Sequence, residues 1–407
     1  MTIAPRRIYR KADAMKDIPF SRPEYARRIA KVENAMEAAG LDALFVEDPS
    51  NMAWLTAYDG WSFYVHQGVI LIPGEDPYWW GRGGQDTPGA KRTVWMEDAH
   101  VLGYADEYVQ ATDRHPMQDL ASVLRAKGLA GKRIGLELDN YYFSAKAFLT
   151  LKEELPDAHL ADATGLVNHC RGVKSEEEII FMRRAARIAE TVIDGVMERV
   201  EPGMAKNELV AEIYRDQIRG ADGHWGDYTA IAPLTPSGAD AAAAHLTWNG
   251  KPFAADECTF FELAGCYRRY HVPFCRSVYL GKPPQHILDA EKALVEGLEA
   301  GLEIARPGAR AGDIARALHG ALYRAGIERK GRCGYPIGLS YPPDWGERTM
   351  SFRESDESVL EPNMTFHFMP GLWMDGWGLE ITESILIRED GPAECFCDRP
   401  RKLYVKE

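Results

Sequence analysis

The chain has 407 residues, of which 45% are hydrophobic and 27% are charged. This length is enough for two domains with substantial cores, and the composition is that of an ordinary globular protein. The formal net charge of −13 argues against nucleic acids and anionic membranes as main partners, since both require a basic face. No apolar run approaches the roughly 20 residues that a membrane-spanning helix needs.

The seven cysteines are odd in number and scattered along the chain. Only Cys395 and Cys397 lie close together, and no second pair follows at zinc-site spacing. This usage favours reduced thiols and a cytoplasmic location. The first twenty residues are basic but lack the apolar core of a secretory signal, so we expect a frayed or partner-docked arm there.

The first part of the chain alternates between helical and extended patterns. Residues 23–39 carry apolar side chains at helical spacing, and Gly40 directly after them is a natural helix terminator. Short apolar runs predict three strands, and a second helical pattern lies before the last of them. The strands are expected at 41–49, 68–73 and 134–139, and the helix at 115–129. The alternation predicts an α/β (α+β) domain with a small mixed sheet.

A long amphipathic helix is predicted at 174–200, because Ser175 and Glu178 form a capping-box pattern ahead of helical periodicity. A domain boundary is expected shortly before this helix. The predicted domains are therefore 1–168 and 169–407.

The segment TFFELAGCYRRYHVPFCRS at 259–277 resembles the D-x-G-A…D-x-T-R segment of the "pita-bread" enzymes. This family includes methionine aminopeptidase, prolidase, aminopeptidase P and creatinase. The resemblance implies a small creatinase-like N-terminal domain followed by a pita-bread catalytic domain. It also implies a homodimer in which an N-terminal loop reaches the active site of the partner subunit.

Five positions of this family hold two metal ions, and four of the five carry unsuitable side chains here. Proline offers no ligand, and tyrosine, methionine and threonine replace histidine and glutamates. Methionine and threonine are poor ligands for hard or borderline divalent ions. The residues at the five positions are Glu262, Pro273, Tyr335, Met369 and Thr382. We therefore expect no metal and no other cofactor, as in creatinase.

Strand alternation sorts the side chains that should face the pocket, because every second residue of a strand shares one face. If the former metal positions point inward, Glu380 points inward with Thr382 and His367 points inward with Met369. The predicted pocket floor is Glu262, Glu380, His367, Thr382, Met369 and Tyr335. The alternative for either glutamate is an exposed strand residue or a member of a salt bridge.

His245 ends the run PSGADAAAAH just before the first of these strands. In the relatives that this chain resembles, a histidine there acts on the substrate as acid, base or hydrogen-bond donor. The alternative is an ordinary loop histidine.

Aromatic residues are dense between residues 48 and 68, where Tyr58, Trp61 and Phe63 are the candidate substrate contacts. Trp225 could add a further wall from the second domain. Aromatic faces bind flat cations by cation–π contact. The alternative for each of them is a core position.

Replacing the metal ligands narrows the chemistry. Water attack on a neutral amide requires a polarised carbonyl, which the family's metal ions supply. The carbon of a protonated guanidinium or amidinium is already electron-poor, and carboxylates can hold its positive charge. Glu262 and Glu380 facing one pocket suit such a cation.

Four further segments resemble the ectoine hydrolase branch of the family: PSNMAWLTAYDGWSFYVHQ, VKSEEEIIFMRRAARIAE, GLSYPPDWGE and GWGLEITE. The resemblance implies opening of the cyclic amidine ring of ectoine, a zwitterion, to N-acetyl-diaminobutyrate, which a deacetylase then consumes. Glu262 would be general base or nucleophile, Glu380 would hold the amidinium N–H groups, and His245 would protonate the leaving nitrogen. The sequence leaves open whether hydroxyectoine is also a substrate.

Three other functions fit parts of these observations. A creatinase-like amidinohydrolase would share the fold and the altered metal positions. A non-catalytic binding module would share the fold alone, although it would not need two inward carboxylates. A metallopeptidase with unusual ligands would need the positions occupied by Pro273 and Met369 to bind metal.

Overall fold

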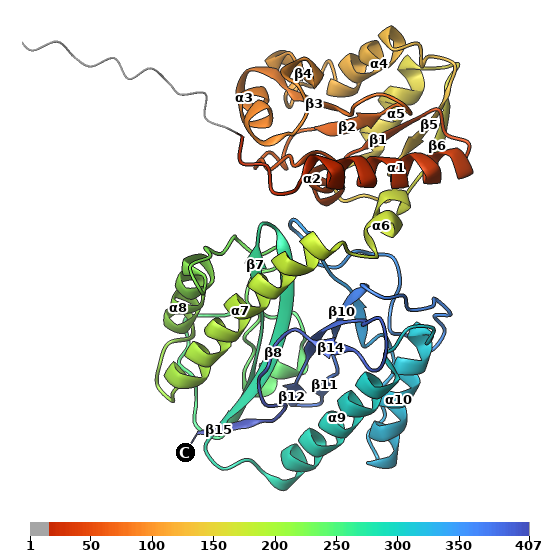
Figure 1. The fold of residues 1–407 in the computed structure, drawn as a ribbon. Helices are drawn as coiled ribbons and strands as arrows, with labels where there is room; N and C mark the ends of the chain where they lie inside the picture. Colours follow the sequence, from red (N-terminus) through yellow and green to blue (C-terminus); the bar gives the residue numbers. More distant parts are fainter. Residues whose placement is uncertain (1–15, 407) are drawn as a thin grey trace, which may run out of the picture. The chain divides into compact units, whose positions relative to one another are not determined.

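The computed structural model describes residues 16–406, which form two compact units that divide between Leu166 and Val167 (Figure 1). The predicted domain ends at residues 1 and 407, and most of the basic N-terminal arm, lie outside the described residues. Within the described range, no helix is both long enough and apolar enough to cross a membrane.

A six-stranded mixed sheet organises the first unit, with strand order β4-β3-β2-β1-β5-β6. Strand β1 pairs antiparallel with β2 and parallel with β5. The strands are β1 Ala43–Val46, β2 Gly68–Leu71, β3 Tyr78–Arg82, β4 Val101–Tyr104, β5 Arg133–Leu136 and β6 His159–Asp162. The helices are α1 Arg22–Ala38, α2 Pro49–Thr56, α3 Gly83–Thr93, α4 Pro116–Ala126 and α5 Ala145–Glu154, with short 3-10 turns η1 Asp98–His100 and η2 Asp106–Tyr108.

Local sequence explains most of these boundaries. Helix α1 begins after Ser21, whose side chain accepts from the backbone N–H of Glu24, and Gly40 beyond its end has a φ of +64°. The strand predicted over 41–49 is shorter than expected. It ends at Val46 because Asp48 caps helix α2, which Pro49 opens.

The second unit is built around a long antiparallel hairpin of β7 Glu257–Tyr267 and β8 Tyr270–Leu280. The short β15 Tyr404–Lys406 pairs parallel with β8. A four-stranded sheet has the order β14-β13-β10-β9, and β11 and β12 form a separate pair. Their bounds are β9 Gly334–Pro336, β10 Thr365–Phe368, β11 Gly371–Met374, β12 Trp377–Glu380, β13 Glu383–Leu386 and β14 Glu394–Cys395.

Helices cover these strands, as Figure 1 shows. Helix α7 follows the predicted capping box of Ser175 and Glu178 and packs along the β7–β8 hairpin. It approaches closely at Gly265, where a Cβ would meet the carbonyl oxygen of Ala185 at 2.0 Å. The helices are α6 Leu166–Arg171, α7 Glu176–Arg199, α8 Lys206–Arg219, α9 Gln285–Ile304 and α10 Ala311–Arg324, with the 3-10 turn η3 Gly238–Ala242.

The main core of this unit lies between α9, α10 and the shorter strands. Leu298 and Leu318 from the helices share one cluster with Phe366, Phe368 and Ile385 from β10 and β13. The predicted α/β (α+β) class is confirmed. In this unit the strands form the interior and the helices lie on their outer side. This arrangement leaves the strand residues opposite α7 and α9 to form a buried polar site.

Candidate active site

Two glutamates form the centre of a buried polar cluster in the second unit. Glu262 lies in the middle of β7 and is 7% exposed, whereas Glu380 ends β12 and is fully buried. Neither carboxylate oxygen of Glu380 makes a hydrogen bond of ordinary geometry among the described residues, although a contact with the Cys275 thiol partly offsets the rise of its pKa. An unpartnered buried carboxylate is costly, so its position requires either a proton or a ligand that donates hydrogen bonds.

Burial shifts both glutamates toward their neutral forms, and repulsion by Glu262 adds to the shift of Glu380. Burial raises the pKa of Glu262 to about 7. Burial, and then the negative charge of Glu262, raise the pKa of Glu380 well above its usual value. Two carboxyl groups whose charges interact strongly lose their protons in two separate steps as the pH rises. At neutral pH the pair can therefore carry a single negative charge and one proton.

A chain of hydrogen bonds runs beside Glu262. The Trp345 side-chain N–H donates to the Tyr335 hydroxyl at 2.7 Å, and this hydroxyl lies 2.9 Å from His367 Nδ1. His367 Nε2 lies 2.9 Å from Thr382 Oγ1, and His367 Nδ1 lies 4.0 Å from the Glu262 carboxylate. Because the indole can only donate, Tyr335 keeps its own proton to donate to Nδ1, and Nε2 then donates to Thr382.

His367 is held neutral in this chain. Burial lowers its pKa to about 3, so the imidazole carries no charge at neutral pH. Its two nitrogens are already engaged by Tyr335 and Thr382. His367 therefore orients the cluster and contributes no cation that would neutralise Glu262.

Cys275 belongs to the site although the sequence did not point to it. It lies directly opposite Glu262 in the β7–β8 register, and its backbone N–H donates to Thr382 Oγ1 at 2.8 Å. Burial, followed by the charges of Glu380 and Glu262, raises the pKa of its thiol well above the usual value. The thiol is therefore a poor nucleophile. Only the strand register, which is not visible in the sequence, reveals this neighbour.

Arg329 was also missed by sequence reasoning. Its Nε donates to the Gly371 carbonyl at 2.7 Å, and Gly371 is the residue directly opposite Glu380 in the β11–β12 pair. The positive charge of Arg329 opposes the rise in the Glu380 pKa that burial causes. Arg329 is thus the cation that favours the ionised form of Glu380.

The other face of the same strands holds a separate ion pair. Arg276 and Glu383 are both fully buried, and the Arg276 guanidinium lies 2.7 Å from the Glu383 carboxylate. Arg401 adds a second contact to Glu383 at 3.2 Å. Glu383 therefore faces away from the cluster that Glu380 joins.

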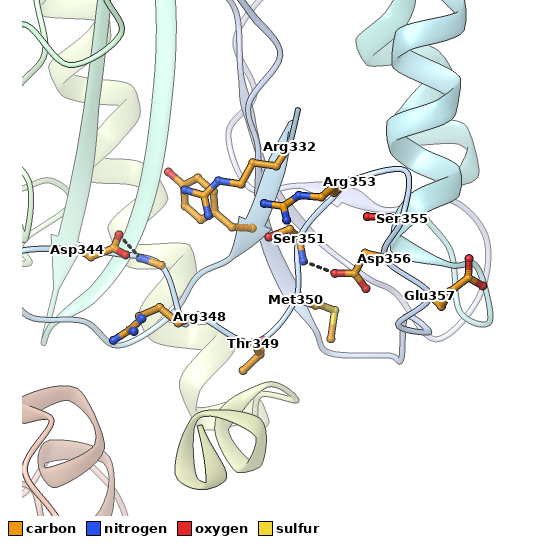
Figure 2. Close-up of a pocket in the computed structure, with 12 residues that line it drawn as sticks. Arg332, Asp344, Arg348, Thr349, Met350, Ser351, Arg353, Ser355, Asp356 and Glu357 are labelled. Atoms are coloured by element: carbon orange, nitrogen blue, oxygen red, sulfur yellow. Dashed lines mark hydrogen bonds between the residues drawn. The ribbon is translucent and has the colours of Figure 1, made fainter. Parts of the chain in front are cut away.

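A cavity of about 510 Å³ adjoins this cluster at Tyr335 (Figure 2). The Arg332 guanidinium lies 4.8 Å from the centre of the Tyr335 ring. The other lining residues come from the loop after β9 and are Asp344, Gly346, Arg348, Thr349, Met350, Ser351, Arg353, Ser355, Asp356 and Glu357. The cavity and the cluster therefore share Tyr335.

The model of the metallopeptidase family M24 matches residues 181–389, and that of the creatinase/prolidase N-terminal domain matches residues 28–173. The chain belongs to family M24. It is 56% identical to an ectoine hydrolase of Halomonas elongata over 96% of this chain and 99% of the relative. It is also 36% identical to an uncharacterised hydrolase/peptidase of Sinorhizobium fredii over 97% of this chain and the whole relative.

Solved M24-type structures share the fold. A prolidase from Thermococcus sibiricus superposes with a TM-score of 0.80 at 18% identity, over 94% of this chain and 99% of that one. The dipeptidase PepE from Mycobacterium ulcerans superposes with a TM-score of 0.78 at 22% identity, over 95% of this chain and 99% of that one. At these identities the likeness establishes the fold alone.

The side chains at the M24 metal positions do not fit two divalent ions. Pro273 has no donor, and the hydroxyls of Tyr335 and Thr382 are occupied by His367. Met369, just beyond β10, offers only a thioether. Across residues 16–406, no group of three His, Cys, Asp or Glu side chains is arranged to hold a metal ion. This M24 chain keeps one carboxylate, Glu262, of the donor set.

Five of the predicted site residues form one cluster in the second unit, two others belong to the same unit outside this cluster, and three belong to the first unit. Glu262, Glu380, His367, Thr382 and Tyr335 form the cluster described above. His245 is exposed in a turn after η3 and, in the part of the chain that the structure describes, contacts neither glutamate. Trp225 is 49% exposed and lies 5.5 Å from the Tyr267 ring.

The three aromatic candidates of the first unit differ in exposure. Tyr58 is buried, and its hydroxyl donates to Gln67 at 2.7 Å. Trp61 is 62% exposed and lies 4.8 Å from the Phe63 ring. Tyr58 is therefore part of the core of its own unit, whereas Trp61 and Phe63 form an aromatic surface.

Proposed function

We propose that this protein is a hydrolase that opens the cyclic amidine of ectoine to N-acetyl-diaminobutyrate without a metal ion. The observation that carries the proposal is the buried pair of Glu262 and Glu380, with neither oxygen of Glu380 in a hydrogen bond of ordinary geometry among the described residues. An amidinium supplies both a positive charge and N–H donors to such a pair. The 56% identity to an ectoine hydrolase supports the choice of substrate.

The reaction adds one water molecule to the ring. Glu262 removes a proton from water as its oxygen attacks the amidinium carbon that carries the methyl group, and a tetrahedral intermediate forms. The bond from that carbon to one ring nitrogen then breaks, the electron pair stays on the nitrogen, and the proton passes to this leaving amine. The remaining carbon becomes the acetyl carbonyl. In the alternative sequence, Glu262 itself attacks and water then releases the acyl group.

Glu380 is proposed to hold the amidinium N–H groups throughout. Its burial makes each charge-assisted hydrogen bond stronger than it would be in water. Because an amidinium is already electron-poor, the polarisation that metal ions provide to an amide carbonyl is not needed. His245, proposed from the sequence as the proton donor to the leaving nitrogen, is exposed, so we assign the return of the proton to Glu262 and keep His245 as a second candidate.

We further propose a cytoplasmic homodimer in which Trp61 and Phe63 contribute to the substrate site, with Trp225 and, through its packing, Tyr58. Trp61 supports this assignment because it is 62% exposed and packs against the Phe63 ring, which gives an aromatic surface suited to contact with a flat cation. All seven cysteines are free thiols, which suits the cytoplasm. The acetylated product calls for a deacetylase as the next enzyme.

Ring opening followed by proton NMR tests the proposal. The wild-type protein should convert ectoine to the ring-opened product, and Glu262→Gln should lower turnover by at least about a thousandfold, because it removes the base. Glu389→Gln, an exchange at an exposed glutamate, serves as the matched control.

Creatine is offered in parallel, with urea as the readout. Near wild-type ring opening by Glu262→Gln would remove Glu262 from the mechanism. Release of urea from creatine without turnover of ectoine would make the protein a guanidine hydrolase instead.

A further inference from the structure

The β11–β12 pair has one face in the main core and its other face toward the two glutamates. Leu372 of β11 belongs to the main core, so the residues on either side of it face the other way. On that second face, Gly371 lies directly across from Glu380, and Trp373 lies directly across from Gly378. Because both facing partners are glycines, no side chain of this strand pair separates Trp373 from Glu380.

The indole of Trp373 covers the position directly across from Glu380. A Cβ at Gly371 would meet the indole atom Cζ2 at 2.7 Å and the indole atom Cε2 at 3.3 Å. Cε2 is bonded to Nε1, so the edge of the ring that carries the N–H is the edge turned toward this position. The side chains of Trp373 and Glu380 are therefore immediate neighbours across the strand pair.

The same indole packs against the cluster of residues that surrounds Glu262. This cluster includes Leu234, Phe260 and Cys275. Leu234 and Cys275 lie directly across from Glu262 on its two sides, and Phe260 shares its face of β7. Trp373 and the two glutamates therefore border the same region of the second unit.

The polar groups that border this region have opposite hydrogen-bonding needs. Trp373 Nε1 is buried, has no hydrogen-bond partner among the described residues, and can only donate. The oxygens of Glu380 make no hydrogen bond of ordinary geometry within residues 16–406, and in the ionised form they can only accept. A ligand that satisfies both groups must carry an acceptor as well as donors.

Arg329 places a positive charge beside the indole. The carbon of its guanidinium lies 5.7 Å from the centre of the Trp373 ring, and its Nε donates to the Gly371 carbonyl at 2.7 Å. A positive charge next to an N–H donor favours an anionic acceptor over a neutral one. The acceptor that suits this side of the region is therefore a carboxylate.

We propose that Trp373 binds the substrate carboxylate through its indole N–H and thereby sets the orientation of the ring. The proposal rests on the proposed function, since it places the amidinium at Glu262 and Glu380. A zwitterion is then held at both ends, with its carboxylate at Trp373 on the side of Arg329 and its cation at the glutamates. A plain amidine makes only the second of these contacts, so the indole N–H favours substrates that carry both charges.

The test compares two substrates in matched tryptophan variants. The substrates are ectoine and the same methylated cyclic amidine with hydrogen in place of the carboxylate. Trp373→Phe keeps an aromatic ring and removes the N–H. The control is Trp377→Phe, on the same strand pair but with its side chain against the main core. Ring opening gives kcat and KM for each protein and substrate.

With ectoine, Trp373→Phe should raise KM about tenfold or more while kcat changes much less, because a hydrogen bond to a carboxylate remote from the reacting carbon is equal in ground and transition states. With the analogue, the same variant should change neither constant. Trp377→Phe should match the wild type with both substrates.

A spectroscopic measurement decides the question if Trp373→Phe does not fold. In the Glu262→Gln protein with isotope-labelled tryptophan, saturating ectoine should move the indole N–H proton signal of Trp373 downfield in NMR spectra, because the N–H gains a charged acceptor. The analogue should leave this signal in place. The signal is assigned by its loss in Trp373→Phe or Trp373→Tyr, and calorimetry establishes saturation.

Equal losses for ectoine and the analogue would show that Trp373 only packs against the substrate, and would overturn the carboxylate contact while leaving the proposed function intact. An unchanged KM for ectoine, or an indole signal that ectoine does not move, would do the same. If the wild-type protein neither binds nor opens ectoine, the proposed function fails and the carboxylate contact fails with it.

Discussion

Glu262 is under opposing demands, because burial favours its neutral form whereas the proposed catalysis requires its charge. Burial raises its pKa to about 7, which is a suitable value for a general base at neutral pH. The same shift costs stability whenever the group is ionised. The raised pKa of Glu262 therefore lowers the stability of the fold when the group is ionised, and it suits the proposed role of Glu262 as a base.

We expect Glu262→Gln to stabilise the fold above neutral pH. A folded pKa above the ordinary 4.5 means that the stability contributed by the protonated form is present below about pH 4.5 and is lost as the pH rises through about 7. Glutamine cannot ionise, so the variant does not lose this stability. The free energy of unfolding of Glu262→Gln should therefore exceed that of the wild type by roughly 1–3 kcal/mol at about pH 8. Denaturant unfolding of both proteins at about pH 5 and about pH 8 measures this difference. A difference between variant and wild type that is equal at the two pH values would contradict the account.

Arg329 should control the pH at which the site becomes active. Its positive charge favours ionised Glu380, so Arg329→Met should move the acidic limb of kcat/KM upward by roughly 0.5–1 pH unit. Arg329→Lys, which keeps the charge, should restore the limb. A uniform loss of activity at every pH, with the limb in place, would indicate that Arg329 only supports the structure.

At the scale of elements, strand periodicity predicted which side chains face the site, but not which strands are neighbours. Alternation correctly placed Glu262 and Glu380 in one cluster with His367. Glu380 and Thr382 were expected on one strand, yet β12 ends at Glu380 and β13 begins at Glu383, because the two strands pair with different partners. Pairing between distant segments depends on packing, which local sequence does not encode.

Neighbours across strands were missed for the same reason. Cys275 is opposite Glu262 only by virtue of the β7–β8 register, and Arg329 reaches the site from a loop after α10. By contrast, the capping box at Ser175 and the terminator at Gly40 are local signals, and both were predicted. The aromatic stretch after residue 48 begins with helix α2, which was not predicted. The side chain of Asp48 caps this helix and accounts for its start.

Strands β8 and β13 are joined by the buried pair of Arg276 and Glu383, and breaking it should cost stability rather than chemistry. Arg276→Gln leaves Glu383 buried without its main counter-charge, so we expect a loss of about 3–5 kcal/mol. Adding Glu383→Gln should recover part of that loss. Denaturant unfolding of both variants measures the two values, and a single-variant loss below about 1 kcal/mol would show that Arg401 compensates.

At the scale of the whole molecule, sequence motifs were enough to predict the family fold. The M24 and creatinase/prolidase N-terminal models together match most of the chain, as the motifs predicted, and the altered metal positions stay a prediction from the sequence. The cavity was not predictable, because packing and the hydrogen bonds between loop carboxylates and backbone N–H groups bring its lining residues together.

The first unit should contribute to substrate binding through Trp61. Because this side chain is 62% exposed, Trp61→Ala should leave the free energy of unfolding within about 0.5 kcal/mol of the wild type. It should lower kcat/KM for ectoine about tenfold, in line with the loss of a cation–π contact. Tyr58→Phe, which removes a buried hydrogen bond to Gln67, is the contrasting control and should cost about 1 kcal/mol of stability. Unchanged kcat/KM in Trp61→Ala would contradict the assignment.

The most direct measurement is the rate of ectoine ring opening by chelator-treated protein whose metal content has been determined by mass spectrometry. The account predicts the full rate with far less than one metal ion per chain, because Glu262 and Glu380 act on a substrate that brings its own positive charge. Loss of turnover on chelation, recovered only when a divalent ion is restored, would contradict it.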